Sequence, residues 1–192
     1  MGKIYYLMGK SASGKDHIYE HLIQETALDL KPFVLYTTRP IREGETDGVE
    51  YFFVDQERFD EMMDEEKIIE FRSYNTKCGI WTYFTADDGQ IDLKKGHYLG
   101  IGTLESYQKM RNYYGESNVV PVYIEVEDGE RLIRAVKREK EQETPKYEEL
   151  CRRFLADQED FSEEKIKEAG ISRRFENDDI DVCVRNITYF IN

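Results

Sequence analysis

The stretch that decides the fold is Gly9-Lys10-Ser11-Ala12-Ser13-Gly14-Lys15, which fits the pattern G-x-x-x-x-G-K. Directly before it, residues 4–8 form a continuous apolar run, Ile-Tyr-Tyr-Leu-Met, typical of a strand buried on both faces of a parallel sheet. After it, Ile18, Leu22 and Ile23 recur at helical spacing and predict a helix over about 15–27. A strand, a glycine loop and a helix in this order form half of a βαβ unit, the context in which the motif is credible.

This phosphate loop (P-loop, residues 9–15) predicts a triphosphate site. Its glycines let backbone N–H groups and the helix N-terminus approach phosphate oxygens, while Lys15 can reach the β- and γ-phosphates. Asp16 stands where such loops carry a Ser or Thr hydroxyl for Mg²⁺, so its carboxylate is the candidate metal ligand. The residues assigned to ATP binding here are Gly9, Lys10, Ser11, Ala12, Ser13, Gly14, Lys15 and Asp16. The alternative is a glycine-rich turn without a ligand.

Beyond the loop, strand-like and helix-like segments alternate. Residues 33–36, 97–101 and 119–126 are rich in β-formers, and 104–114 and 129–140 resemble helices. This alternation predicts an α/β fold with three layers, α/β/α, around a parallel sheet core. The intervening segment holds many Tyr and Phe residues and turn pairs such as Asp47-Gly48, which favour hairpins over helices.

We therefore expect one domain over residues 1–192 with three functional parts. The core comprises 1–36, 96–128 and 168–192, the inserted β-rich subdomain that binds the acceptor comprises 37–95, and a helical lid comprises 129–167.

Composition narrows the class of partner. The 192 residues are 40% hydrophobic, enough for an ordered domain, and 27 basic against 40 acidic residues give a net charge of -13. This charge disfavours nucleic acid and anionic membranes as partners. Cys78, Cys151 and Cys183 lie far apart, which argues against a disulfide framework or zinc site and favours a reduced, cytoplasmic protein. The apolar start is shorter than a signal-peptide core or a membrane span.

A second group of residues suits a phosphorylated acceptor. Arg39 and Arg42 flank a turn that Pro40 constrains. Both can form bidentate hydrogen bonds to one monophosphate, with the Tyr51 hydroxyl as a further donor. Glu70 can accept hydrogen bonds from N1–H and the N2 amino group of guanine, an edge that adenine lacks. Taken singly, the arginines and the glutamate could be solvated surface charges, and the tyrosine could pack a hairpin face.

The expected lid carries further arginines. In a helix from about residue 129, Arg131, Arg134 and Arg138 share a face, with Leu132, Ile133 and Val136 on another side. Arg153 follows on the next helix, for which Thr144-Pro145 is the expected N-cap and first turn. Closure would bring this basic face over the phosphates. The alternative is that these arginines pair with the glutamates between 139 and 149.

Together these motifs resemble guanylate kinases over nearly the whole chain. That family reads T-T-R-x-x-R-x-G-E, as at 37–45 here, then G-x-x-Y-x-F-V, as at 48–54, then I-E, as at 69–70. The resemblance extends to the lid arginines and to Asn177-Asp178-Asp179. It implies Mg²⁺-dependent transfer of the ATP γ-phosphoryl group to GMP or dGMP in the cytoplasm, and a homodimer is a compatible assembly.

The resemblance also implies residue roles. It implies catalytic roles for Lys15, Arg39, Arg138 and Arg153, and ATP contact for Arg134. Acceptor contacts are implied for Arg39, Arg42, Tyr51 and Glu70.

The chain departs from the family at several acceptor positions. Leu35 replaces a serine, Cys78-Gly79-Ile80-Trp81 replaces Tyr-Gly-Ser or Tyr-Gly-Thr, and Gly100 and Gly102 stand where the family's strand typically carries aspartates. Two alternatives therefore stay open beside GMP phosphorylation: a non-catalytic binding module of the same fold, and a kinase for a different acceptor.

Overall fold

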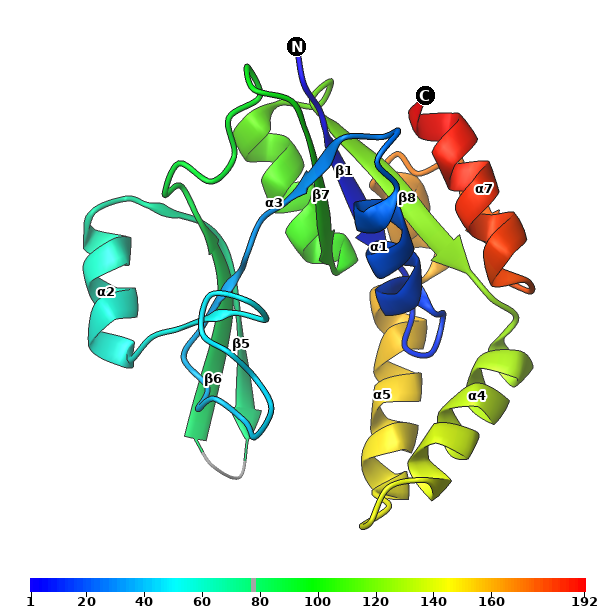
Figure 1. Cartoon of the computed structure of the whole chain (residues 1–192). Coiled ribbons are helices and arrows are strands. Elements are labelled where there is room, and N and C mark those ends of the chain that lie inside the picture. Colours follow the sequence, from blue (N-terminus) through cyan, green and yellow to red (C-terminus); the bar gives the residue numbers. More distant parts are fainter. Residues whose placement is uncertain (77–78) are drawn as a thin grey trace.

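The core is a five-stranded parallel sheet with β1 (Ile4–Met8) at its centre, as seen in the computed structural model, which describes residues 1–76 and 79–192 (Figure 1). The strand order is β2-β7-β1-β8-β9, and each pair of neighbours runs parallel. The other strands are β2 (Leu30–Pro32), β7 (His97–Gly102), β8 (Val119–Glu125) and β9 (Arg174–Glu176). The buried apolar run at 4–8 is thus the central strand that its sequence predicts.

Helices cover both faces of this sheet and confirm the three-layer α/β/α class. Successive residues of β1 point to opposite faces. Tyr5 and Leu7 pack with α1 (Lys15–Gln24) and α7 (Ile180–Ile191). Tyr6 and Met8 pack with α3 (Leu104–Tyr114) and α6 (Glu163–Glu168) on the other side. The expected helix at 104–114 has these bounds, whereas the one at 15–27 ends earlier, at Gln24.

A second, mixed sheet lies beside the core and is built from residues 36–86 (Figure 1). Its order is β4-β3-β6-β5, with β3 (Tyr36–Thr37), β4 (Phe52–Phe53), β5 (Ile68–Thr76) and β6 (Gly79–Ala86). The antiparallel pair β5–β6 is the hairpin that the turn-rich composition predicts.

One secondary-structure prediction in this region is wrong, and one helix was not expected. Helix α2 (Gln56–Asp64) lies within the expected β-rich segment, because Asp55 caps it and Phe59 and Met62 bury a helical face against Phe84. The strand expected at 33–36 is divided between two sheets. Residues 30–32 pair with β7 in the core, and 36–37 pair in the second sheet, so the segment between them is a crossing.

Helices α4 (Asp128–Lys140) and α5 (Tyr147–Asp160) form an antiparallel pair that projects from the core (Figure 1). One expectation fails here, because the N-cap of α5 is Lys146, not Thr144. Helix α4 buries Arg131 and Ala135, whereas Leu132 and Ile133 are exposed. The reason is that the inner face of α4 meets polar groups of the P-loop instead of an apolar core.

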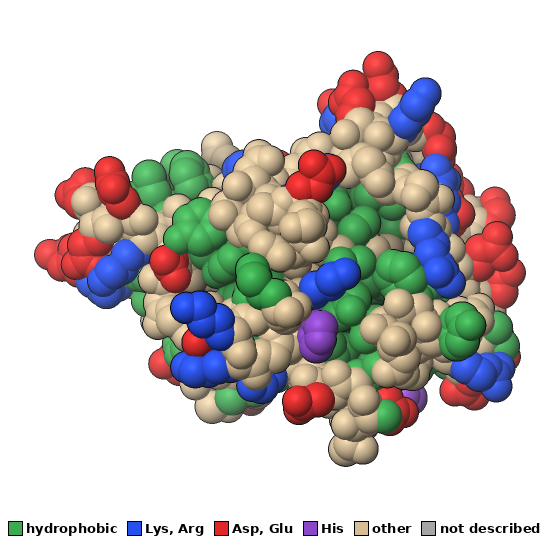
Figure 2. Space-filling view, turned by 90° about the horizontal axis from the view of Figure 1, so that it is seen from above, with side chains coloured by type: hydrophobic (Ala, Val, Ile, Leu, Met, Phe, Trp, Pro, Cys, Tyr) green, Lys and Arg blue, Asp and Glu red, His purple; other side chains and the backbone are tan. Residues whose placement is uncertain are grey.

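The surface agrees with the acidic composition. Figure 2, seen from the end at which both termini lie, shows basic side chains interspersed with acidic and apolar ones. Within residues 1–76 and 79–192, no helix combines the length and the apolar character needed to cross a bilayer. Cys151 and Cys183 are free thiols, and Cys78 lies outside the described residues.

The two glycines of β7 are enclosed by aromatic side chains. A Cβ at Gly100 would lie 2.5 Å from Cζ of Phe33 and 3.0 Å from Cδ2 of Tyr6. A Cβ at Gly102 would overlap the Tyr6 hydroxyl and the Ser106 hydroxyl, which hydrogen-bond each other over 2.8 Å. Tyr6 and Phe33 therefore occupy the volume into which side chains at these two positions would extend.

This packing predicts that Gly100→Ala destabilises the protein by about 1–3 kcal/mol, because the core must shift to accept the methyl group. Chemical denaturation measures the change. Phe33→Leu removes the ring atoms nearest to the added Cβ, so the double variant Gly100→Ala/Phe33→Leu should lose less stability than the sum of the two single variants. An additive double variant would contradict the steric explanation.

Candidate active site

The P-loop makes a tight turn between the central strand β1 and helix α1. Ala12 (φ 61°) and Gly14 (φ 83°) both adopt left-handed backbone conformations, which are uncommon for a non-glycine residue and recur at functional sites. Gly9 is equally constrained, because a Cβ there would lie 2.7 Å from the Ile124 carbonyl oxygen. The loop thus turns directly from the buried strand into the N-terminus of α1, an arrangement suited to an anion.

Two buried side chains hold the carbonyl groups of this loop. The Asn177 side-chain amide donates to the Ser13 carbonyl oxygen over 2.8 Å, and the Arg131 guanidinium donates to the Ser11 carbonyl oxygen over 2.9 Å. Only 4% of Asn177 and 1% of Arg131 is exposed. Because these carbonyl oxygens are held by protein donors, they are kept from an incoming phosphate, which a carbonyl oxygen would repel.

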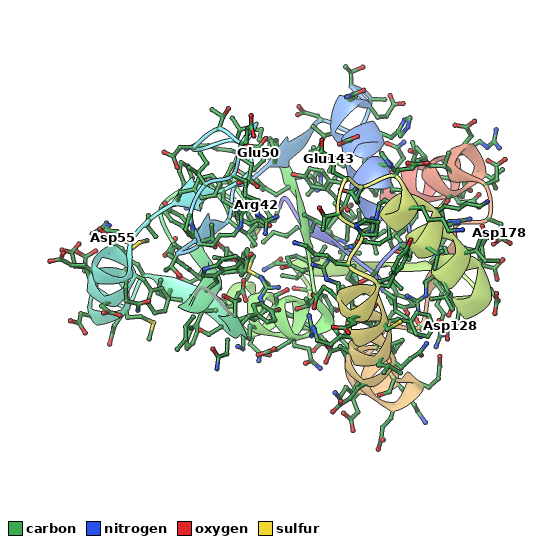
Figure 3. The ribbon with its side chains drawn as sticks, turned by 90° about the horizontal axis from the view of Figure 1, so that it is seen from below. Arg42, Glu50, Asp55, Asp128, Glu143 and Asp178 are labelled. Carbon is green, nitrogen blue, oxygen red and sulfur yellow. The ribbon has the colours of Figure 1, made fainter. Side chains whose placement is uncertain are left out.

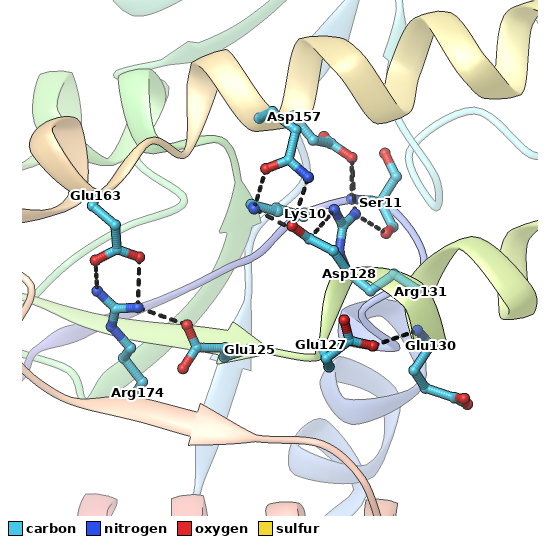
Figure 4. Close-up of polar contacts among 11 residues, drawn as sticks. Lys10, Ser11, Glu125, Glu127, Asp128, Glu130, Arg131, Asp157, Glu163 and Arg174 are labelled. Carbon is cyan, nitrogen blue, oxygen red and sulfur yellow. Dashed lines mark hydrogen bonds and ion pairs between the residues drawn. The ribbon is translucent and has the colours of Figure 1, made fainter.

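Helices α4 and α5 clamp the first half of the loop (Figure 4). The Asp157 carboxylate accepts a hydrogen bond of 2.8 Å from the Ser11 backbone N–H and lies 3.3 Å from Arg131. Arg131 also pairs with Asp128 over 2.6 Å, and the Lys10 ammonium lies 3.3 Å from the same carboxylate. A loop N–H that could serve a phosphate is thus engaged by a carboxylate of the chain itself.

The other residues assigned to the triphosphate lie around this clamp. Lys15 is half-buried and Asp16 is exposed, both in the first turn of α1. Arg134 donates to the Asn177 carbonyl oxygen over 3.1 Å and pairs with Glu130. The resemblance implies that Arg134 contacts ATP. In the structure Arg134 contacts Asn177, the residue that holds the Ser13 carbonyl group of the P-loop.

Arg138 and Arg153 come together from two helices. Both line a cavity of about 120 Å³ between α4 and α5, which the Ser11 end of the P-loop also lines. Both arginines are exposed. Arg153 pairs with Glu149 over 2.9 Å. This is the pairing with a glutamate of residues 139–149 that the sequence left open as an alternative. The same carboxylate also pairs with Arg152, and the hydrogen bonds from these arginines lower the pKa of Glu149 to about 2.

On the second sheet, Arg39 is held in a bidentate ion pair. Its two terminal nitrogens donate to the Glu45 carboxylate over 2.7 and 2.5 Å, and its guanidinium carbon lies 5.2 Å from the Tyr51 ring centroid and 5.1 Å from that of Phe53. The buried Arg39 Nε has no hydrogen-bond partner among the residues that the structure describes. The ion pair with Glu45 therefore fixes the guanidinium, and its Nε–H remains as an unused donor.

Arg42 and Tyr51 lie near this cation. The Arg42 backbone N–H donates to Glu45, while its side chain is exposed and lies on the side of the second sheet turned toward the core (Figure 3). Burial raises the pKa of Tyr51, on which the charges of Arg39, Arg72 and Asp16 also act. The structure thus brings Arg39, Arg42 and Tyr51 together.

Glu70 is enclosed by other side chains of the chain. Its side chain has no exposed surface and accepts hydrogen bonds from Thr85 over 2.8 Å and from Arg72 over 3.3 Å. Burial raises the pKa of this carboxyl group, and Arg72 opposes that effect. Sequence reasoning missed Arg72, although residues two apart on a strand point to the same face. It also missed Asp157, which has no sequence signal beyond its charge, and it gave no role to Glu45, the last residue of the motif at 37–45.

The described residues contain no cluster of three His, Cys, Asp or Glu side chains that could hold a metal ion. Asp16 at the start of α1 can supply one carboxylate oxygen. This set fits Mg²⁺, which typically takes one or two carboxylates and completes its shell with phosphate oxygens and water.

The comparisons with known proteins agree with this arrangement. A sequence model of the family described as "Guanylate kinase" matches residues 1–192. The chain is similar to guanylate kinases of Legionella pneumophila (strain Lens), at 39% identity over 69 residues, and of Aliivibrio fischeri, at 33% over 97 residues. These matches cover 36% and 48% of this chain and only 32% and 46% of the relatives.

A solved structure supports the fold along nearly the full length. The guanylate kinase of Anaplasma phagocytophilum superposes with a TM-score of 0.65 at 22% identity and covers 99% of this chain and 84% of its own. At this identity the likeness is evidence for the fold.

The contact between Asp157 and Ser11 predicts that Asp157→Ala tightens MgATP binding by roughly three- to tenfold, since the triphosphate no longer competes with a carboxylate for the loop N–H. Isothermal titration calorimetry measures the dissociation constant. Asp160→Ala, on the same helix, is the matched control and should leave it unchanged. Weaker binding by Asp157→Ala would mean that the carboxylate maintains the binding conformation of the loop.

The Arg39–Glu45 pair predicts a pH-dependent contribution to stability. Hydrogen bonds from Arg39 lower the pKa of Glu45 to about 2 in the folded state, against about 4.3 in an unfolded chain. The stabilisation is therefore complete above the unfolded pKa and is lost as the pH falls toward 2. The difference in unfolding free energy between wild type and Glu45→Gln should be constant above about pH 5.5 and shrink below it. Glu43→Gln, in the same loop, should give a difference that changes less with pH.

Proposed function

The chain belongs to the guanylate kinase family, and from this premise we propose that it transfers the γ-phosphoryl group of ATP to GMP or dGMP, giving ADP and the corresponding diphosphate. The observation that carries the proposal is the P-loop at the end of the central strand, with left-handed backbone at Ala12 and Gly14 and arginines approaching it from α4 and α5. The arginines that surround this loop would be of use to a ligand with several negative charges.

On the donor side, residues 9–15 and the N-terminus of α1 would hold the β- and γ-phosphates, with the Lys15 ammonium as the mobile cation. Arg138 and Arg153 would stabilise the charge on the transferred group when α4 and α5 close, and Arg134 would support the nucleotide side of the loop. Asp16 would supply an oxygen ligand to Mg²⁺, which neutralises triphosphate charge when bound. The lid of residues 129–167 stays part of this proposal.

On the acceptor side, Arg39, Arg42 and the Tyr51 hydroxyl would hold the monophosphate. The Arg42 side chain lies on the side of the second sheet turned toward the core (Figure 3), and the charge of Asp16 acts on Tyr51. The acceptor phosphate would therefore face the P-loop, as in-line transfer requires. A cytoplasmic location, without nucleic acid or membrane as partner, belongs to the same proposal.

A different nucleotide acceptor is the second candidate, and a specific observation favours it. Tyr6 and Phe33 fill the space beside Gly100 and Gly102, the positions at which the family's strand typically carries aspartates. The surroundings of the base thus differ from those implied by the resemblance, whereas the phosphate-binding residues agree with it. A coupled ADP-release assay over GMP, dGMP, AMP, CMP and UMP decides between the acceptors.

We predict that Lys15→Ala and Arg39→Ala each lower turnover by roughly a hundredfold or more, the scale of removing one preorganised charge that stabilises a transition state. The assay is ADP release at saturating MgATP with the preferred acceptor. Lys94→Ala, which removes an exposed lysine, is the control and should retain wild-type turnover.

Unchanged turnover in both variants would contradict the proposed roles. A non-catalytic binding module would instead show no Mg²⁺-dependent binding of ATP in isothermal titration calorimetry, and this result would favour that alternative over a kinase.

A further inference from the structure

The acceptor side contains a cation that the proposed reaction does not yet use. Arg72 lies on β5 two residues after Glu70, so both side chains point to the same face of the second sheet. The Arg72 side chain is 11% exposed, whereas the Glu70 side chain has no exposed surface. The guanidinium therefore covers the carboxylate, and an incoming base would meet Arg72 before Glu70.

The hydrogen bonds of Arg72 leave donors unused. Its Nη2 donates to Glu70 Oε1 and its Nη1 to Thr103 Oγ1, each over 3.3 Å. The Nε lies 3.2 Å from Glu70 Oε2, yet neither of these buried atoms makes a hydrogen bond within residues 1–76 and 79–192. Leaving a charged donor and a charged acceptor buried without a hydrogen bond costs free energy. A ligand that satisfied both atoms would recover that cost.

Neighbouring elements fix the position of this pair. Thr103 is the N-cap of α3 and shares hydrogen bonds with Ser106, which in turn accepts from the Tyr6 hydroxyl. Thr85 of β6 holds the other side of Glu70. The Arg72 guanidinium is thus anchored between the second sheet and the P-loop side of the core sheet, and its charge acts on Tyr51 among the acceptor residues.

The pair offers a donor beside an acceptor. A carboxylate alone can accept from N1–H and the N2 amino group of guanine, but it cannot serve the O6 atom next to them. A guanidinium beside it supplies the missing donor. Adenine has an amino group in place of O6, which would face the guanidinium donor to donor.

We propose that Arg72 is a specificity-determining residue of the acceptor site, which selects a 6-oxopurine nucleotide by donating to O6 while its neighbour Glu70 accepts from the N1 and N2 side. The base reaches Glu70 by drawing the guanidinium aside from the carboxylate it covers. This inference rests on the proposed function in one respect only, that the acceptor is a nucleotide held by Arg39, Arg42 and Tyr51.

Equilibrium binding of three monophosphates tests the inference without relying on turnover. GMP carries O6 and the N2 amino group, IMP carries O6 alone, and 2-aminopurine riboside monophosphate carries the amino group alone. Isothermal titration calorimetry with wild type and Arg72→Ala should show GMP and IMP affinity falling roughly ten- to a hundredfold, the value of a hydrogen bond from a charged donor. Affinity for the 2-aminopurine nucleotide should change by less than about threefold, because it has no O6 to lose.

Two further variants separate this role from a structural one. Glu70→Gln should weaken GMP more than IMP, because only GMP offers the amino group. Arg72→Lys keeps the positive charge beside Glu70 but loses the planar set of guanidinium donors. It should bind GMP and IMP more tightly than Arg72→Ala and less tightly than wild type. If Arg72→Ala folds poorly, the same ratios are measured with Arg72→Lys against wild type. Arg58→Ala, an exposed arginine of α2, is the control and should leave the three affinities unchanged.

An equal loss for all three nucleotides would overturn the inference, because it would show that Arg72 acts without reference to O6. Wild-type affinity that does not depend on O6 would overturn it as well. If GMP binds with the expected pattern but no ADP is released, the proposed function fails and the assignment of Arg72 stands. If the wild type binds none of the nucleotides, both fail.

Discussion

The structure depends on a backbone constraint at the end of β1. Within residues 9–14 the chain must leave a strand buried on both faces and enter α1, and it does so with left-handed conformations at Ala12 and Gly14. Such conformations persist only where surrounding contacts maintain them. Here Asn177 and Arg131 hold the loop carbonyl groups from the far end of the chain and from α4. The position of α4, and of α5 packed beside it, follows from these contacts.

Patterns that depend on one local environment could be predicted from the sequence. The run at 4–8, the glycine loop and the helix at 104–114 each have one set of neighbours, so periodicity and motif sufficed for them. Predictions failed where one segment serves two environments. Residues 33–36 pass between two sheets, so the single strand expected there is divided. Asp157 could not be found from sequence, because its role arises from a contact between distant elements. Glu45 closes the motif at 37–45, but its ion pair with Arg39 depends on the folded turn.

The acceptor site shows how packing and charge change together. Large rings at Tyr6 and Phe33 lie against the glycines of β7, so that part of the core is filled without carboxylates. The same region has Arg72 placed over Glu70, which makes the buried pair neutral. A lone buried carboxylate would be costly to desolvate, whereas a paired one is less so. Reading Glu70 from sequence as a single negative charge was therefore incomplete, since the unit that the fold presents is a pair.

On the proposed function, the Asp157 carboxylate at the Ser11 N–H would make α5 an intramolecular competitor of the nucleotide. Its local concentration is set by the packing of α4 against α5 and does not change with the amount of protein, so it would raise the apparent dissociation constant for ATP by a fixed factor. Binding and helix position are then thermodynamically linked. Anything that draws α5 away from the loop raises nucleotide affinity, and by reciprocity nucleotide binding loosens α5 by the same free energy. The position of α4 and α5 is thus coupled to nucleotide binding at the P-loop through the Asp157 carboxylate.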